Sequence, residues 1–366
     1  MVTPSAPCRV KLHYLGEHSW GGTRSELPQT SIREVARRAG VSVGTVSNVL
    51  NRPDLVAEAT RDRVRAAIEE LGFVRNETAR RLRRGPERTA GEFGDQPRRA
   101  FGIVAEDLTN PYASDVARGA EAAFNAAGHD ALWLSSDQSS AKERRSLELL
   151  EEQRAAGVLI IPVGGDPGGL SRLRAAGMSV VLIDRDSSEA CSARVDHVAG
   201  GEIAAAHLLG IGRERIVFVT GVPEPQPCVD RRDGAARTIV EAGLSKPRTL
   251  VQDALSPTEG QAAAHEVMAL SPRPDGVFCA NDLLAIGLIN ELTRLGVRVP
   301  DDIAVIGYDD IELAASAAVP LTTIRQPRRE LGWEGAELAL AEMAEGSSHQ
   351  HRQVVQHPEL VIRESA

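Results

Sequence analysis

Several polar side chains in this sequence directly follow short apolar runs, where they could together bind a small polar molecule. These residues are Asn110, Asp184, Arg185, Asn281 and Asp309. Carboxylate, amide and guanidinium groups suit a ligand with many hydroxyls. Each residue could instead cap a strand end or form a hydrogen bond between two lobes of the fold, and for Asp282 we favour such a structural role, as a helix cap. The pattern indicates binding more than catalysis.

Motifs of enzyme chemistry are missing from the sequence. The segment GGDPGG at 164–169 is rich in glycine, but there is no GxxxxGK[ST] and no GxGxxG after a strand. No nucleophile elbow and no Ser/His/Asp order is visible. We therefore expect no enzyme and no cofactor.

The histidines and cysteines show no metal-binding spacing. The nine histidines form no HExxH motif or ligand cluster, and His349, His351 and His357 fall in a C-terminal region that reads as irregular. The four cysteines form no CxxC and no Cys/His cluster; they are Cys8, Cys191, Cys228 and Cys279. We expect reduced thiols of a cytoplasmic protein and no metal site.

From Ala100 to the C-terminus, short apolar runs alternate with helical stretches. Strands alternating with helices form parallel sheets covered on both faces. About nine or ten strands fit two doubly wound halves better than one sheet. Ligands of such sheets bind outside the carboxyl ends of the strands, where the polar residues fall. Helices are expected at 113–127, 140–154, 168–176, 198–210, 229–243, 258–269 and 283–295.

Residues 31–51, SIREVARRAGVSVGTVSNVLN, have the pattern of two short helices joined by a tight turn. Ser31 and Glu34 form a capping box, and Gly40 can end the first helix. A third helix at 58–71 would close a small core. Such a pair of helices is typical of a helix-turn-helix, whose second helix lies in the DNA major groove. An ordinary helical hairpin is the alternative.

In the helix-turn-helix geometry, the start of the second helix meets DNA. Val43 could contact a thymine methyl group, Gly44 offers no side chain, and Asn48 could pair with adenine. Thr45 and Ser47 are better placed for phosphates. Ser42, which can cap this helix, belongs to the same DNA-contacting set.

The net charge of −9 is unevenly distributed. Residues 30–85 carry 12 Arg against 7 Asp and Glu, a balance of +5, whereas the part after residue 85 carries −15. A basic N-terminal part on an acidic body fits a nucleic-acid-binding module. Residues 1–29 read as a disordered tail without the apolar run of a signal peptide, and no stretch has the length of a membrane span. We expect no membrane partner.

Three sequence blocks resemble the LacI–GalR family of bacterial transcription regulators: AGVSVGTVSNVLN, TRDRVRAAIEELGF and N-x-x-A-R-x-L. The resemblance implies a hinge helix at 76–84 that folds on DNA and inserts Leu82 into a minor-groove base step. The hinge residues expected at DNA are Asn76, Ala79, Arg80, Leu82 and Arg83. We assign residues 30–84 to the DNA-binding domain, with 85–99 as a linker rich in Gly, Pro and charge.

The resemblance continues through 100–366, in DLTNPY, VVLIDR, DHVAGG, VDRRDGA, CANDLLAIG, VIGYDDIELA and PLTTIRQP. It implies a two-lobed, periplasmic-binding-protein-like core for effector binding and dimerisation. Asp184, Arg231, Asn281 and Asp309 match effector-binding positions of the family, and Tyr112 matches an aromatic residue of its pocket. Near Leu255 and Ser256, where a sugar-stacking aromatic often lies, this chain has no ring.

These features predict a homodimeric repressor that binds a near-palindromic operator and responds to a small molecule. A sugar or sugar derivative is the expected effector, with nucleobases as the alternative class. The pattern leaves open whether the effector induces or co-represses. PELVIRESA shows no leucine heptad, so we expect a dimer without a terminal coil. A solute-binding receptor and a sugar-metabolising enzyme are the competing functions.

Overall fold

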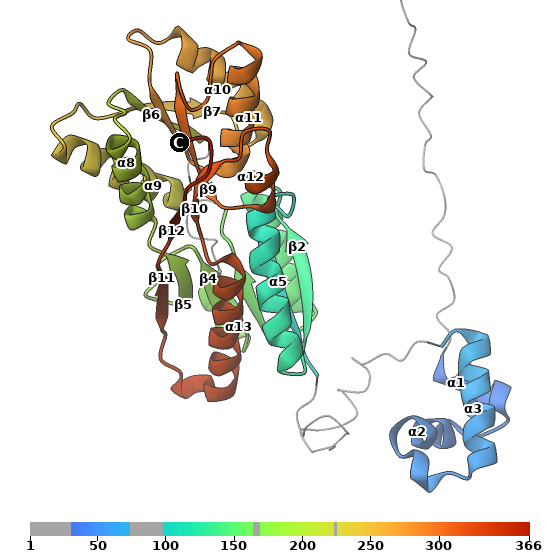
Figure 1. Cartoon of the computed structure of the whole chain (residues 1–366). Coiled ribbons are helices and arrows are strands. Elements are labelled where there is room, and N and C mark those ends of the chain that lie inside the picture. Colours follow the sequence, from blue (N-terminus) through green and yellow to red (C-terminus); the bar gives the residue numbers. More distant parts are fainter. Residues whose placement is uncertain (1–30, 74–97, 164–168, 223–224) are drawn as a thin grey trace, which may run out of the picture. The chain divides into compact units, whose positions relative to one another are not determined.

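The computed structural model describes residues 31–73, 98–163, 169–222 and 225–366 (Figure 1). The chain forms two units, one up to residue 89 and one from residue 90, and each is described by itself. The expected tail at 1–29, the hinge helix at 76–84 and most of the linker at 85–99 lie outside the described residues.

The N-terminal unit contains the expected helices. They are α1 (Ile32–Ala39), α2 (Val43–Asn51), the short 3-10 helix η1 (Pro53–Leu55) and α3 (Glu58–Leu71). The capping box is confirmed, since the Glu34 amide donates to Ser31 Oγ and the Ser31 amide donates to the Glu34 carboxylate. Gly40 follows α1 with a φ of 64°, a left-handed conformation that glycine adopts without a steric penalty.

A small apolar core joins α1, α2 and α3. Its buried residues are Val35, Ala36, Ala39, Val46, Val49, Val64 and Ala67. Leu50, which we expected to point inward, packs against this core while remaining half-buried, and Val49 takes the more buried position. The core fixes the angle between α1 and α2, so the exposed face of α2 is presented on a rigid support.

The C-terminal unit contains two six-stranded sheets, which confirms the two-lobed fold class (Figure 1). The first sheet has the order β11-β5-β4-β3-β1-β2 and the second β12-β10-β9-β8-β6-β7. Every described pairing is parallel except that of β12 with β10. The first-sheet strands are β1 (Ala100–Ala105), β2 (Asp130–Ser135), β3 (Gly157–Ile160), β4 (Ser179–Ile183), β5 (Cys191–Val195) and β11 (Gln353–Gln356). The second-sheet strands are β6 (Ile216–Gly221), β7 (Arg248–Gln252), β8 (Gly276–Cys279), β9 (Ala304–Asp309), β10 (Thr322–Arg325) and β12 (Glu359–Val361).

The helices of this unit are α5 (Pro111–Ala126), α6 (Ser140–Glu152), α7 (Leu170–Ala175), α8 (His197–Gly210), α9 (Gln226–Glu241), α10 (Pro257–Ala269), α11 (Asp282–Arg294), α12 (Glu312–Ser316), α13 (Arg328–Glu345) and the 3-10 helix η2 (Gly346–Ser348). The seven expected helices are present as α5 to α11, whereas α12 and α13 were not expected. No helix among the described residues is long and apolar enough to cross a membrane.

The sequence-based strand number was too low, because twelve strands are described where nine or ten were expected. The C-terminal region that read as irregular forms β11 and β12, which join opposite sheets. Both are short, with exposed residues between half-buried ones, so their apolar signal is weak. Their pairing partners, β5 and β10, are distant in the sequence.

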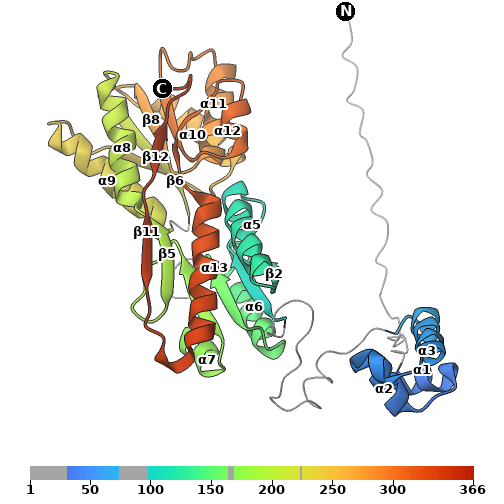
Figure 2. The ribbon, with the colours of Figure 1, turned by 60° about the horizontal axis from the view of Figure 1, so that its bottom comes forward.

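The chain passes between the two sheets three times, after β5, before α13 and between β11 and β12. Helix α13 follows β10 of the second sheet but packs on β3, β4 and β5 of the first. Figures 1 and 2 show α13 beside α5. Repeated crossing places the carboxyl ends of both sets of strands around one shared space.

Helices α8 and α9 approach closely through two glycines. A Cβ on Gly201 would lie 1.9 Å from the carbonyl oxygen of Arg231, and one on Gly234 would lie 2.2 Å from that of Val198. Only glycine permits such backbone contact. The close packing brings His197, at the start of α8, within reach of Arg231 on α9.

Candidate functional site

A pocket lies between the carboxyl ends of the two sheets and encloses about 550 Å³, part of it open to solvent. All seven residues expected to bind the effector line it: Asn110, Tyr112, Asp184, Arg185, Arg231, Asn281 and Asp309. The first four come from the first lobe and the last three from the second. Residues as far apart in the sequence as Asn110 and Asp309 thus converge on one space, because parallel strands end at one edge.

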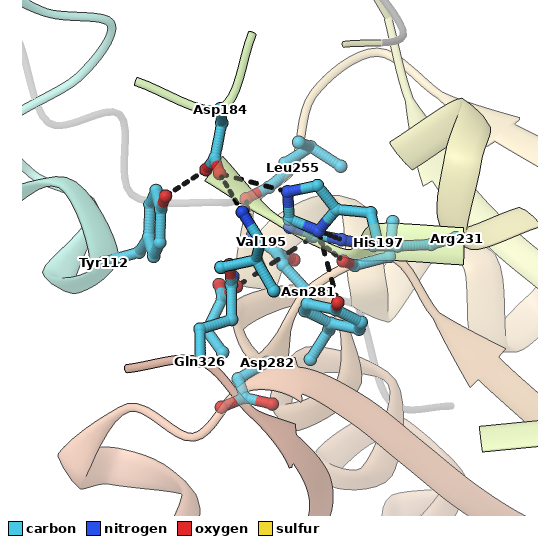
Figure 3. A network of polar contacts seen from close by, with 12 residues as sticks. Tyr112, Asp184, Val195, His197, Arg231, Leu255, Asn281, Asp282 and Gln326 are labelled. Atoms are coloured by element: carbon cyan, nitrogen blue, oxygen red, sulfur yellow. Dashed lines mark hydrogen bonds and ion pairs between the residues drawn. The ribbon is translucent and has the colours of Figure 1, made fainter. Parts of the chain in front are cut away.

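A buried polar network forms the floor of the site (Figure 3). The Tyr112 hydroxyl donates to Asp184 Oδ2, and His197 Nε2 lies 3.1 Å from Asp184 Oδ1. Arg231 Nε donates to His197 Nδ1 over 3.3 Å. The network therefore joins Asp184 of the first lobe to Arg231 of the second through His197.

These contacts determine the protonation state of His197. A guanidinium has only donors, so Nδ1 must accept from Arg231 and the proton must reside on Nε2, which donates to Asp184. Burial lowers the pKa of His197, although Asp184 acts in the opposite direction. A neutral imidazole fits both observations.

Arg231 is a buried cation with contacts on several sides. Its Nη1 donates to the Ala280 carbonyl over 2.7 Å and lies 3.9 Å from Asp309 Oδ1. Its guanidinium carbon lies over the ring of Tyr308. Such a group is held in one orientation and can present its remaining donors to a ligand.

The two carboxylates at the strand ends differ in their pKa. Burial would raise the pKa of Asp184, but hydrogen bonds from His197 and Tyr112 and the charge of Arg231 hold it below its usual range. Burial raises the pKa of Asp309 to about 6, against the opposing effects of Arg231 and Arg328. Asp184 is thus ionised and accepts hydrogen bonds at neutral pH, whereas Asp309 takes up a proton near pH 6.

Both carboxylates sit on unusual backbone. The φ angle is 53° at Asp184 and 113° at Asp309, a region that L residues other than Asn and Asp adopt rarely. Strain of this kind, about 1–3 kcal/mol per residue, concentrates at binding sites. The chain therefore holds these two side chains in the pocket at a cost to its backbone.

Sequence reasoning missed three polar residues of this region: Glu106, His197 and Gln326. Glu106 lines the pocket directly after β1, a position that the strand-end pattern could have found. Gln326 donates to Asp309 Oδ1 over 2.6 Å. His197 lies at the start of a helix rather than at a strand end, so no positional signal pointed to it.

The expectation that Asp282 caps a helix is wrong in detail. Asn281 is the N-cap of α11 and accepts from the Leu284 amide over 3.0 Å. Asp282 is buried one position later, where it accepts from Thr323 and from the Ile311 amide. Asn281 therefore caps the helix and lines the pocket at once, while Asp282 ties α11 to β10.

The DNA-contacting candidates of α2 lie on its outer side. Ser42, Val43, Gly44 and Asn48 are exposed, and Thr45 and Ser47 are half-buried. Ser42 caps α2 by accepting from the Thr45 amide, and its hydroxyl also lies 2.9 Å from that of Thr45. The hinge candidates, Asn76, Ala79, Arg80, Leu82 and Arg83, lie outside the described residues.

Three cysteines, Cys191, Cys228 and Cys279, are buried and lie outside any disulfide, as expected; Cys8 lies outside the described residues. The expectation that no cysteine and histidine cluster exists is wrong. Cys191 lies beside His349 and His351, because β5 pairs with β11, and sequence spacing cannot show such a pairing.

Two sequence families match the chain. Residues 31–76 match "Bacterial regulatory proteins, lacI family", and residues 205–366 match "Periplasmic binding protein-like domain". The HTH-type transcriptional repressor PurR of Photobacterium profundum is 34% identical over 339 residues, which cover 92% of this chain and 98% of the relative.

Solved structures resemble the chain as well. The complex of the transcriptional regulator CelR with cellobiose is 28% identical, with a TM-score of 0.68, and the match covers 92% of this chain and 100% of that one. A LacI family transcriptional regulator from Enterococcus faecium with bound ribose is 25% identical, with a TM-score of 0.66, over 73% of this chain and 98% of that one.

Proposed function

The chain belongs to the lacI family of bacterial regulatory proteins, and from this we propose that it binds a near-palindromic operator as a homodimer and that a sugar occupies its pocket. It is a DNA-binding transcriptional repressor with a small-molecule effector. A solute-binding receptor without DNA function is not favoured, because the similarity to the repressors spans the N-terminal helices and the core together.

The convergence of the seven effector candidates on one pocket carries the proposal for the ligand site. These side chains supply two carboxylates, two amides, two guanidinium groups and one phenol. A ligand with several hydroxyls can accept from the guanidinium of Arg231 and donate to the carboxylates of Asp184 and Asp309. The polar character of the pocket therefore suits a sugar or a sugar derivative.

The number of aromatic residues in the pocket helps to decide between a sugar and a nucleobase as the ligand. Tyr112 is the one aromatic residue among the described lining residues, and its hydroxyl is bonded to Asp184. Leu255 lines the pocket where a second ring could have stacked on a base. A nucleobase gains much of its binding energy from stacking, so this lining supports a sugar, in line with the cellobiose and ribose of the two similar structures.

We propose that α2 reads the operator in the major groove. Val43 would contact a thymine methyl group and Asn48 an adenine, while Ser42, Thr45 and Ser47 would contact phosphates beside Gly44. A second copy of the chain would place a second α2 one turn of DNA away, which requires a two-fold dimer. Leu82 would wedge the minor groove, with Asn76, Ala79, Arg80 and Arg83 beside it.

We propose lobe closure as the switch. A sugar that contacts Asp184 of the first lobe and Arg231 of the second binds the closed arrangement more tightly than an open one. Closure would move the N-terminal end of the core, and with it residues 85–99, which lead to the DNA-binding part. A coupling of about 1–3 kcal/mol would change operator affinity roughly 5- to 150-fold.

We further propose that the protein acts in the cytoplasm, where its DNA target lies, and that it releases its effector unchanged. The relatives are repressors. Among the residues described, the buried network does not pair a nucleophile with a general base as acyl transfer requires. Mass spectrometry of a sugar before and after prolonged incubation tests the second point.

The test of the function is capture of genomic DNA. Sheared DNA from the source organism is incubated with the purified protein at moderate salt, since phosphate contacts alone retain DNA at low salt, and the retained fragments are sequenced. We expect a near-palindrome upstream of transport or catabolic genes. Retention without sequence preference, with or without a panel of sugars and nucleobases, would contradict the proposal.

A further inference from the structure

A second cluster of ligand-type side chains lies in the first lobe, outside the pocket. Cys191, Glu342, His349 and His351 bring one sulfur, one carboxylate and two imidazoles together, and these donor atoms all lie within 4.8 Å of one another. Cys191 Sγ lies 3.0 Å from His349 Nε2 and 3.8 Å from His351 Nδ1. These two distances are close to those between the ligands of one tetrahedral ion, since bonds of about 2.0–2.3 Å place its ligands about 3.3–3.8 Å apart.

The four residues come from three elements. Cys191 begins β5, Glu342 lies in the last turns of α13, and both histidines lie between η2 and β11. Cys191 is at the amino end of a parallel strand, whereas the pocket lies at the carboxyl ends. Figure 2 shows the end of α13 and the start of β11 at the edge of the sheet away from the second lobe. The cluster is therefore separate from the effector pocket.

The cluster is shielded but accessible. Cys191 is fully buried and Glu342 is 8% exposed, while the His349 side chain is 2% exposed. His351 is half-buried. An ion could thus enter past His351 and be largely removed from water once bound.

A neighbouring carboxylate orients one imidazole toward the sulfur. His349 Nδ1 lies 2.7 Å from Glu345 Oε2 and donates to it, which leaves Nε2 as the acceptor facing Cys191. Histidines that bind metals commonly donate their other N–H to a carboxylate in this way. The backbone amide of Arg352 also donates to Cys191 Sγ over 3.3 Å.

We propose that Cys191, Glu342, His349 and His351 bind one divalent transition-metal ion, with Zn²⁺ as the best match. Thiolate and imidazole donors select borderline-soft ions over Mg²⁺ or Ca²⁺, and four protein ligands of this kind suit the tetrahedral preference of Zn²⁺. Binding breaks the S–H bond of Cys191, forms the bond from sulfur to the ion, and releases the proton to solvent.

The surrounding charges are compatible with a cation. Arg174 lies 3.5 Å from Glu342 and Arg352 lies 2.9 Å from Glu345, so each arginine offsets one carboxylate. The Cys191 thiolate is then the remaining negative charge, and a divalent ion would leave the cluster with a single positive charge. The Val180 amide holds Glu342 in place by donating to Oε2 over 3.0 Å.

A bound ion would tie α13 to β5 and β11. The three elements are joined by hydrogen bonds and packing at this edge, and α13 begins at the pocket, where Arg328 contacts the backbone of Asp310. A bound ion would therefore stabilise the first lobe and hold the C-terminal end of α13 in place.

Cobalt binding tests the proposal on the full-length protein. Co²⁺ replaces Zn²⁺ in such sites, and its thiolate charge-transfer absorption reports a sulfur ligand directly. The reduced, metal-free protein is titrated with Co²⁺ and then with Zn²⁺. We expect the absorption to saturate at one equivalent, Zn²⁺ to displace it, and the melting temperature to rise with Zn²⁺.

Variants assign the ligands. Cys191→Ser should abolish the absorption, and His351→Gln, at a half-buried position, should weaken Zn²⁺ binding by more than the roughly 10- to 100-fold loss that follows removal of an orienting partner. Glu345→Gln should keep the absorption but weaken binding about 10- to 100-fold, because it only orients His349. Cys279→Ser and His357→Gln are controls of the same residue types at other places and should leave binding unchanged.

Two results would overturn the proposal. One is absence of the cobalt absorption in the wild-type protein. The other is saturable binding that survives both Cys191→Ser and His351→Gln, because the ion would then occupy another site. Melting curves recorded without metal show that each variant is folded.

Discussion

The guanidinium carbon of Arg231 lies 3.7 Å from the centroid of the Tyr308 ring, and both residues are buried. The ring face carries negative electrostatic potential, and a cation held over it is stabilised by about 2 kcal/mol when desolvated. Tyr308 also places its hydroxyl 3.2 Å from His197 Nδ1. This ring is therefore a support on which the cation and the imidazole of the pocket are both positioned.

Gly200→Ala should disturb the pocket through Tyr308. A Cβ on Gly200 would lie 2.2 Å from the Tyr308 hydroxyl and 2.8 Å from its ring edge, so the ring must shift away from His197 and Arg231. We expect a loss of stability of about 1–3 kcal/mol, as for overpacking, together with weaker effector binding. Calorimetry for the effector and chemical denaturation measure the two effects.

Gly210→Ala is the matched control on the same helix. A Cβ there meets nothing within 4 Å, so alanine should stabilise α8 by up to about 1 kcal/mol and leave effector affinity unchanged. Equal effector affinities for Gly200→Ala and wild type would show that Tyr308 does not position the pocket.

Glu106→Gln should flatten the pH dependence of stability. Burial, with the charges of Asp184 and Asp309, raises the pKa of Glu106 from 4.5 to about 7. The contribution of Glu106 to the free energy of unfolding is therefore fully present below about pH 4.5 and is lost as the pH rises through 7. The shift corresponds to at most about 3 kcal/mol, less with solvent screening, since Glu106 is only half-buried.

The measurement for Glu106 is the melting temperature between pH 6 and 8. Asp309, with a pKa of about 6, titrates at the lower end of this range in both proteins, so the difference between the two melting curves reports Glu106. The wild type should lose stability relative to Glu106→Gln as the pH rises, and parallel curves would count against a raised pKa.

Arg231→Gln should remove the effector response while operator binding is retained. The substitution takes a buried cation away from Asp309 and His197, and truncating such a group costs about 2 kcal/mol or more in binding, roughly 30-fold. Arg237→Gln is the control on the same helix, since Arg237 is exposed and paired with Glu202. Operator-release titrations compare the variants, and a normal response by Arg231→Gln would place the effector elsewhere.

Asn48→Ala should relax operator preference more than it weakens nonspecific DNA binding. Asn48 is exposed on α2, and a bidentate contact to adenine contributes about 1–3 kcal/mol of discrimination. Fluorescence anisotropy with operator and scrambled duplexes measures both affinities. Asn125→Ala, an exposed asparagine of α5, is the control. Equal losses on the two duplexes would rule out base readout by Asn48.

Local pattern was sufficient to predict much of this protein. The capping box of Ser31 and Glu34, the left-handed Gly40 and the alternation of strands with helices each depend on residues close in sequence, and all are present in the structure. The sequence also predicted that polar residues following the strands would lie together, and Asn110, Asp184, Asn281 and Asp309 do line one pocket. Parallel strands end at the same edge of a sheet whatever the details of packing.

Tertiary structure decided what depends on pairing between distant segments. The position of His197 between Asp184 and Arg231 results from the close packing of α8 on α9 through glycines. Cys191 meets His349 and His351 because β11 returns to the edge of the first sheet. Neither contact has a fixed sequence spacing, and the apolar signal of a short edge strand is weak, so the sequence by itself determined the two lobes and their shared pocket but not these two clusters.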